Sequence, residues 1–352
     1  MTKTERVLCA LKCGTPDCVP YMYNTVMNDI QEKLLGRDLS DEPLINNFNV
    51  TGWLGGIDEI PEVIPSLTIL PEAARLLNLD AIGIQVLPPL FVDAVDTPIG
   101  RFQKGGLISD CDRLKKIKMP DPDDADLFRK IEKMIEKYKQ EFALYARIRL
   151  GAAPTLLSMG IDNFAYSLAN EDELVPNTIS MYTNWIQRFS KNLCEFDFDF
   201  FWCFDDIAFN TGMLISPDSF RTYFKNPMKN AASGIDRPFI FHSDGKIESV
   251  IDDIIEIGAV GLHPIEPGSM DSDWLKKTYG DKLCLIGNID LDKFLTHGTN
   301  DSIDAEVKYR INQFGPGGGY IISDSNSIPS HCNPENILAM SRSVERHRYI
   351  YF

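Results

Sequence analysis

The chain has 352 residues, 44% of them hydrophobic, which is ample for a large buried core. Lys and Arg total 35 against 51 Asp and Glu, and the formal charge of −16 makes nucleic acid and anionic lipid surfaces poor partners. No apolar run reaches the ~18 residues that a membrane span needs, and eight scattered cysteines in apolar surroundings indicate reduced thiols in a cytoplasm.

Eight short apolar or aromatic segments, each followed by polar residues, are predicted to be strands. In chain order they are 19–23, 77–87, 145–150, 197–204, 238–241, 260–265, 283–286 and 320–322. Helical spacing of apolar residues predicts helices around them, at 4–12, about 121–142, 174–193, 217–232, 246–255, 304–314 and 334–345. Segment 29–71 mixes helix and loop signals, and 91–120 is predicted to be an irregular excursion with a β-hairpin around Gly100 and Gly105.

Strands that alternate with helices, without internal repetition of sequence, predict parallel βα units. Eight such units close naturally into a (β/α)8 TIM-type barrel, here a single domain over 1–352 with barrel strands from about 19 to 327 and an N-terminal helical extension. A doubly wound open sheet is the alternative, and the lack of Gly-x-Gly-x-x-Gly after the first strand disfavours it.

Active sites of such barrels lie at the carboxyl ends of the strands, so the polar residues there are the candidates for function. They are Asn24, Gln85, Asp205, Asp206, His242, Asp244, Glu266, Asn288, Asp290, Asp324 and Asn326. So many acids at one mouth predict raised carboxyl pKa values unless a cation is present.

The run Ile240-Phe241-His242-Ser243-Asp244-Gly245 ends a strand with two polar side chains on one face. His242, Asp244 and Glu266 offer one nitrogen and two oxygens, as in a catalytic zinc site with an open position. Alternatively, some of these acids satisfy loop amides and cap helices. Adjacent Asp205 and Asp206 point to a substrate contact, whereas His263, inside an apolar strand, is predicted to be a core histidine.

Five stretches resemble the uroporphyrinogen decarboxylase superfamily over nearly the whole chain. They are TERVLCALKCGTPDCVP, DDIAFNTGMLISPDSF, FHSDGKIESVIDDIIEIGAVGLHPIEPGSMD, YGDKLCLIGNIDLDKFLTHGT and GGGYIISDSNSIPSHCNPENILAM. The resemblance implies a (β/α)8 barrel and one of two activities. One is cofactor-free decarboxylation of the acetate arms of uroporphyrinogen; the other is zinc-dependent methyl transfer between a corrinoid protein and a thiol such as coenzyme M. It also implies a homodimer.

The decarboxylases of this superfamily carry an Arg-Gln-Ala-Gly-Arg signature after the first strand, whose arginines grip substrate carboxylates. Residues 21–26 of this chain read Tyr-Met-Tyr-Asn-Thr-Val, without an arginine, and the decarboxylase histidine near the last strand falls at Asn326. The sequence is therefore more similar to the methyltransferase branch.

The corrinoid methyltransferases bind zinc through a His-x-Cys pair, a Glu and a second Cys. His242 and Glu266 match the His and the Glu, but Asp244 stands at the first Cys, and the second falls at about Ser327, five residues before Cys332. With both thiolates replaced, the site is harder and less suited to activating a thiol.

The leading hypothesis is a corrinoid-linked methyltransferase-like enzyme that acts with methylcobalamin, a free cobamide or a corrinoid protein, and a small acceptor. The predicted roles are catalytic for His242, Asp244, Asp206 and Asn326, substrate-binding for Asn24, Gln85, Asp205 and Asn288, and zinc-binding for His242, Asp244 and Glu266. The alternatives are a metal-free lyase acting on a tetrapyrrole or another carboxylate, and a corrinoid- or tetrapyrrole-binding protein without turnover.

Overall fold

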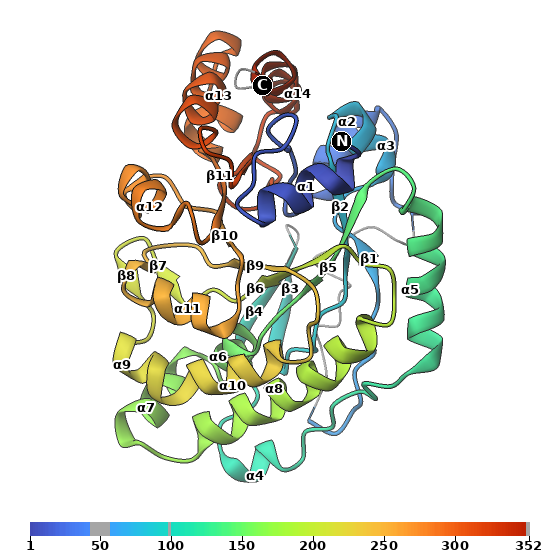
Figure 1. The fold of residues 1–352 in the computed structure, drawn as a ribbon. Coiled ribbons are helices and arrows are strands. Elements are labelled where there is room, and N and C mark those ends of the chain that lie inside the picture. Colours follow the sequence, from blue (N-terminus) through green and yellow to red (C-terminus); the bar gives the residue numbers. More distant parts are fainter. Residues whose placement is uncertain (43–56, 98–99, 350–352) are drawn as a thin grey trace.

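An eight-stranded curled sheet runs through the centre of the structure, a computed structural model that describes residues 1–42, 57–97 and 100–349 (Figure 1). Neighbouring strands pair in parallel, except for the antiparallel pair β1–β2. In sheet order the strands are β1 (Ser66–Leu67), β2 (Ala81–Gln85), β5 (Ala143–Ile148), β6 (Phe200–Phe204), β9 (Phe239–His242), β10 (Gly261–His263), β11 (Cys284–Ile289) and β12 (Tyr320–Asp324). The predicted TIM-type barrel architecture is confirmed.

The seam of the barrel lies between β12 and β2, where the segment predicted as the first strand runs. Tyr21 bridges Ile322 in parallel, and the Tyr21 carbonyl accepts the Asp80 N–H at 2.8 Å. The prediction of a regular strand over 19–23 is wrong. Pro20 has no N–H to donate, and the Tyr21 N–H is taken by the Asp80 carboxylate at 2.8 Å, so only isolated bridges form.

Helices cover the outer face of the sheet, as Figure 1 shows for α5, α8, α10 and α11. The helices are α1 (Lys3–Leu11), α2 (Asn28–Leu35), α3 (Pro71–Leu76), α4 (Cys111–Leu114), α5 (Ala125–Tyr138), α6 (Ala152–Met159), α7 (Ile161–Asn170), α8 (Leu174–Leu193), α9 (Pro217–Ser219), α10 (Lys225–Ala232), α11 (Ile251–Ile257), α12 (Ser272–Tyr279), α13 (Asn300–Phe314) and α14 (Pro334–His347). Short π or 3-10 turns are η1 (Phe220–Phe224), η2 (Glu248–Val250) and η3 (Leu291–Thr296). Pro176 lies in the first turn of α8, as expected, where its missing N–H breaks no helical bond.

The barrel interior is a separate apolar cluster, distinct from the layer between sheet and helices. Alternate residues of each strand point inward, among them Tyr145, Phe200 and Trp202. Helix α1 closes the cluster with Val7, Ala10 and Leu11, which explains the N-terminal helical extension.

A glycine makes room for the ring of Tyr145 in this interior. A Cβ on Gly83 of β2 would lie 2.2 Å from Cε2 of Tyr145 on the neighbouring strand. The Tyr145 hydroxyl can therefore cross the barrel and donate to the Asn24 carbonyl at 2.8 Å. This bond ties the seam segment to β5.

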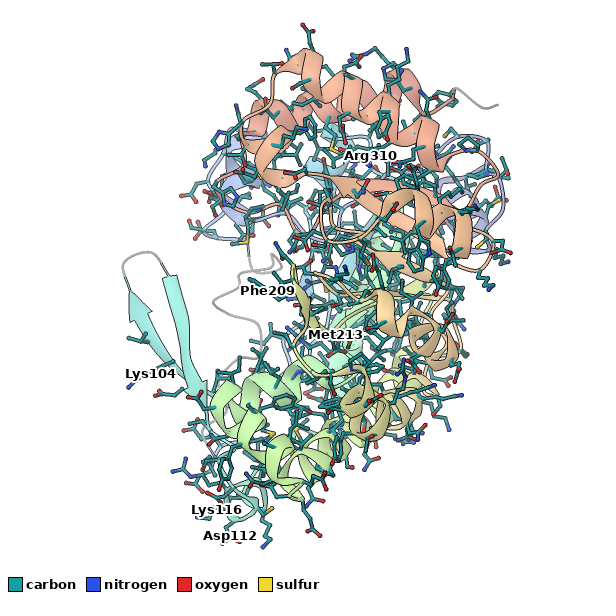
Figure 2. All side chains as sticks on the ribbon, turned by 90° about the vertical axis from the view of Figure 1, so that its left-hand side faces the viewer. Lys104, Asp112, Lys116, Phe209, Met213 and Arg310 are labelled. Atoms are coloured by element: carbon teal, nitrogen blue, oxygen red, sulfur yellow. The ribbon has the colours of Figure 1, made fainter. Side chains whose placement is uncertain are left out.

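Two further hairpins lie outside the barrel. β3 (Val92–Thr97) pairs with β4 (Gly100–Gly106), which confirms the predicted hairpin, and this ribbon stands away from the rest of the chain in Figure 2. β7 (Ala208–Phe209) pairs with β8 (Gly212–Met213) just after β6. Among the helices of the described residues, none is both long and apolar enough to cross a bilayer.

Candidate active site

The inward-facing positions of β5 and β9 change from apolar to polar one step beyond Tyr145 and Ile240, whereas β6 keeps an aromatic ring there. Two residues further along β5, β6 and β9 stand Arg147, Phe204 and His242, all buried. His242 is paired in register with Phe204 on one side and with His263 of β10 on the other. A polar layer therefore lies directly above the apolar interior, at the carboxyl ends of the strands.

Asp206, His242 and Asp244 form a compact cluster in this layer. Nε2 of His242 is 3.5 Å from Oδ1 of Asp206 and 3.7 Å from Oδ1 of Asp244. Ligand atoms of all three lie within 4.8 Å of one another, the spacing of a set that can share one cation. Asn326, at the end of the last strand, donates its Nδ2–H to Oδ2 of Asp244. Four predicted catalytic residues are thus brought together.

Gly245 makes the turn that points Asp244 at this cluster. Its φ is +83°, which glycine adopts without strain. A Cβ at this position would also lie 2.6 Å from the backbone of Phe209 in β7. The chain therefore turns sharply after Asp244 and packs under the β7–β8 hairpin.

His263 is buried, as predicted, but it also contacts the site. Its Nδ1 is 2.6 Å from Nδ1 of His242, and the two rings stack with centroids 4.8 Å apart. Burial and the charge of His242 hold the pKa of His263 well below its usual value, so this ring is neutral. A neutral His263 that accepts from Nδ1–H of His242 leaves Nε2 of His242 turned to the two acids. His263 therefore positions His242, as outer partners do for metal-binding histidines.

The charges of the cluster are strongly coupled. Burial opposes the charge of His242, yet its contacts with Asp206 and Asp244 raise its pKa overall. Burial also opposes ionisation of Asp206, but the hydrogen bond and charge of His242 hold its pKa at about 2. Asp244 has a pKa raised to about 6, by burial and by the charges of Asp206 and Glu266. The cluster thus holds excess negative charge that a cation would neutralise.

Glu266, Asp205 and Asn288 are turned toward the backbone. Glu266 accepts the Gly245 N–H at 2.8 Å and the Ser269 hydroxyl at 3.1 Å, which is the loop-capping alternative. It is not one of the three clustered residues, and its predicted zinc ligation stays a prediction. Asn288 donates to the Ile265 carbonyl at 3.1 Å.

Asp205 braces the start of α6. Its carboxylate accepts N–H groups from Leu150, Gly151 at 3.2 Å and Ala153 at 2.6 Å. Burial raises its pKa to about 6 in spite of these bonds. Its predicted substrate contact stays a prediction, since the structure shows Asp205 holding backbone.

Asn24 and Gln85 both contact Arg147, which is not among the predicted site residues. Oδ1 of Asn24 accepts from Nε of Arg147 at 2.7 Å, and Oε1 of Gln85 accepts from Nη1 of Arg147. Arg149 lies beside Arg147, and both guanidinium groups rest on the Phe204 ring, 3.7 and 4.0 Å from its centroid. Two arginines at i and i+2 in an otherwise apolar strand were the available signal.

Neither position of the missing thiolates is filled by another cysteine. Ser327 lies within 3.5 Å of Nδ2 of Asn24. Cys332 is buried against Thr296, with its Sγ 3.8 Å from the threonine hydroxyl, and burial raises its thiol pKa to about 11. Cys332 is therefore not part of the Asp206–His242–Asp244 cluster.

The cluster nevertheless fits a divalent cation. It supplies one imidazole nitrogen and two carboxylates, a donor set that zinc accepts in catalytic sites. Oδ1 of Asp244 is buried without a hydrogen-bond partner among the described residues, which is costly unless a cation or a proton binds there.

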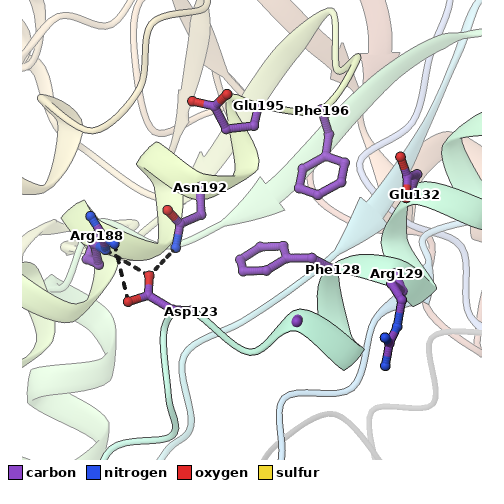
Figure 3. Close-up of a pocket in the computed structure, with 9 residues that line it drawn as sticks. Asp123, Phe128, Arg129, Glu132, Arg188, Asn192, Glu195 and Phe196 are labelled. Atoms are coloured by element: carbon purple, nitrogen blue, oxygen red, sulfur yellow. Dashed lines mark hydrogen bonds and ion pairs between the residues drawn. The ribbon is translucent and has the colours of Figure 1, made fainter.

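A hollow of about 490 Å³ lies elsewhere, on the outer face between α5 and α8 (Figure 3). Three of its polar side chains already pair with one another, since Asp123 accepts from Arg188 at 2.8 Å and from Asn192 at 2.5 Å. Phe128 and Phe196 stack behind them. None of the predicted site residues lines this hollow.

Comparison with known families agrees with this architecture. The model of the family described as uroporphyrinogen decarboxylase (URO-D) matches residues 103–347, well over half of the chain. The chain belongs to the uroporphyrinogen decarboxylase family. Within this family the chain has the barrel and the strand-end layer but, as its sequence shows, no arginine over 21–26.

Two curated relatives of this family member are methylcobamide:CoM methyltransferases named MtaA. The protein of Methanosarcina barkeri is 29% identical over 127 residues, and that of strain Fusaro / DSM 804 is 27% identical. Each match spans 36% of this chain and 36% of the relative, so about a third of each relative is covered. A solved methyltransferase from Methanosarcina mazei shares the fold over 98% of this chain and 99% of its own, with a TM-score of 0.72 and 17% identity.

Proposed function

We propose that this family member is a metal-assisted methyltransferase that moves a methyl group between a corrinoid and a small acceptor. The observation that carries the proposal is the Asp206–His242–Asp244 cluster at the barrel mouth. The partial likeness to methylcobamide methyltransferases supports the same reaction class. The corrinoid is held by a partner protein or is a free cobamide, and the enzyme works in the cytoplasm.

His242, Asp206 and Asp244 would hold the metal, and Glu266, whose Oε2 accepts the Gly245 N–H and the Ser269 hydroxyl, lies outside that set. When bound, the cation would lower the pKa of the acceptor's nucleophilic group. His263 keeps Nε2 of His242 directed at the site, and Asn326 fixes the Asp244 carboxylate. Because carboxylates replace thiolates, the site holds zinc less tightly than a thiolate site does.

Metal content tests the site directly. Purified protein should hold about one zinc per chain after zinc loading, whereas His242→Ala and Asp244→Ala should hold none while their circular dichroism stays unchanged. A matched control is His297→Ala, because His297 lies 3.5 Å from Asp292 in an exposed pair that is not part of the Asp206–His242–Asp244 cluster. Equal zinc in the wild type and both site variants would refute the assignment.

Methyl transfer is measured separately, by loss of methylcobalamin absorbance in the presence of a panel of thiols. Turnover that requires added zinc and disappears in His242→Ala supports the proposal. Turnover that survives chelation contradicts the role of the metal.

A metal-free lyase is the second candidate. Asp206 keeps its negative charge to a pKa of about 2 and could stabilise a cationic intermediate, and the two buried arginines suit a substrate carboxylate. Release of CO2 from a carboxylated tetrapyrrole without metal would favour this reaction. Corrinoid binding without turnover would favour the non-catalytic alternative.

A further inference from the structure

Arg147 and Arg149 are two buried cations on one face of the same strand end. They lie two residues apart in and just after β5, so both side chains point into the mouth. Arg147 is 3% and Arg149 7% exposed. Both guanidinium groups stack on Phe204, whose ring centroid is 6.4 Å from that of His242. The pair and the acid cluster thus flank the same ring.

The two arginines are satisfied very differently. Arg147 donates to the side-chain amides of Asn24 and Gln85, so it is fixed in place by neutral partners. Nε and Nη1 of Arg149 are buried and have no hydrogen-bond partner among the residues that the structure describes. Burial lowers the pKa of Arg147 to about 9 and also lowers that of Arg149.

Nearby carboxylates do not fill this gap. The carboxylate of Asp205 accepts hydrogen bonds from three backbone N–H groups. Oδ1 of Asp206 faces His242 and the Asp244 N–H. Within residues 1–42, 57–97 and 100–349, no ion pair joins a carboxylate to either arginine. Leaving a buried guanidinium unpaired costs several kcal/mol of desolvation, and a ligand oxyanion would recover that energy.

We infer that Arg149, supported by Arg147, binds an oxyanion group of the small-molecule substrate, a carboxylate or a sulfonate. Arg is the side chain best suited to planar, hydrogen-bonded recognition of such a group. The identification of this ligand as the methyl acceptor rests on the proposed function. The acceptor then places its anionic end on β5 and its nucleophilic end at the acids of β6 and β9.

Two thiols of equal length, one anionic and one neutral, distinguish binding of the anionic group from binding of the thiol. We would measure binding of 3-mercaptopropionate and of neutral 3-mercapto-1-propanol by calorimetry, on metal-free protein, and add 2-mercaptoethanesulfonate to distinguish carboxylate from sulfonate. The wild type should bind one of the two anions at least tenfold more tightly than the alcohol, because hydrogen bonds to charged groups contribute about 1.5–3 kcal/mol.

Variants of Arg149 test whether this residue causes the preference for the anion over the alcohol. Arg149→Gln should reduce the preference to less than threefold, and Arg149→Lys, which keeps the charge, should leave an intermediate value. Arg188→Gln is the matched control, because it removes an exposed guanidinium paired with Asp123 on the outer hollow (Figure 3). If Arg149→Gln does not fold, the wild-type preference and Arg149→Lys decide.

Equal binding of the anions and the alcohol by the wild type would overturn the inference, as would an equal loss in Arg188→Gln. Failure of the proposed function gives a different result from failure of the oxyanion site. An anion preference without any methyl transfer refutes the reaction and leaves the oxyanion site, whereas methyl transfer without an anion preference refutes only the site.

Discussion

Replacing Arg149 by Met should stabilise the protein, although it removes a buried hydrogen-bonding group. The guanidinium is buried without an ion pair, and two of its nitrogens lack partners among the described residues. Replacing buried ionic groups by apolar ones of similar volume is neutral to stabilising by about 1–4 kcal/mol. Loss of the stacking on Phe204, 4.0 Å away, costs about 1 kcal/mol. We therefore expect a net gain of about 2 kcal/mol in the free energy of unfolding.

Arg348 provides the opposite case in the same molecule. It is 4% exposed, and it donates to Asp80, to Glu345 at 2.9 Å and to the Val19 carbonyl at 3.1 Å. Arg348→Met breaks a buried pair and should cost about 3 kcal/mol, the low end of the usual range, because Arg6 still pairs with Asp80 at 2.6 Å.

Urea unfolding followed by circular dichroism measures both changes in the free energy of unfolding, and thermal unfolding measures the matching shifts in melting temperature. At about 2.1 cal/mol/K per residue, the unfolding entropy of 352 residues is about 0.7 kcal/mol/K. The melting temperature should therefore rise by about 3 °C in Arg149→Met and fall by about 4 °C in Arg348→Met. Comparable destabilisation of both variants would show that Arg149 is already satisfied, and would refute the reasoning behind the oxyanion site.

Three further predictions concern other parts of the site and barrel. Burial raises the pKa of Asp324 to about 7, so the folded protein holds a proton that the unfolded chain has lost above about pH 4. The stability that this group contributes is full below about pH 4 and is lost as pH rises through 7. In urea unfolding, Asp324→Asn should match the free energy of unfolding of the wild type near pH 4 and exceed it near pH 8, by at most about 4 kcal/mol. A difference that stays constant with pH would contradict this pKa. His263→Phe keeps an edge-to-face ring contact with Trp202 but removes the bond to His242. Chelator competition should therefore show zinc affinity about 10–100-fold lower, and unchanged affinity would exclude a positioning role. Gly83→Ala drives a methyl group into the Tyr145 ring and should cost about 1–3 kcal/mol in a urea titration; a neutral result would mean that the barrel interior is less tightly packed than its contacts indicate.

The sequence predicted the site best where strand periodicity decided it. His242 and Asp244 share a face because they are two residues apart, and a barrel brings the end of β6 with Asp206 next to them. Asn326 follows from the same topology. Asp205, Glu266 and Asn288 obey the identical pattern but turn to backbone groups, because loop geometry, which no spacing reveals, decides what a polar side chain at a strand end contacts.

The roles of two sets of side chains could not be predicted from the sequence, for different reasons. Arg147 and Arg149 lie in and just after β5, where the apolar run predicts a core strand, but two charges on its inward face contradict a plain core strand. His263 was correctly predicted to be buried, but its contact with His242 depends on the β9–β10 register. The prediction of a regular strand over 19–23 is wrong because Pro20 and the Asp80 carboxylate together prevent a regular ladder.

Asp80 joins residues from both ends of the chain. Its carboxylate joins Arg6, 74 positions away, to Arg348, 268 positions away. Loop-closure entropy grows with the logarithm of loop length, so the second contact costs about 1 kcal/mol more than the first. On loop length alone, the contact of Asp80 with Arg6 is the easier of the two to form, and the contact with Arg348 closes the longer loop. Contacts of such long range slow the folding of a chain.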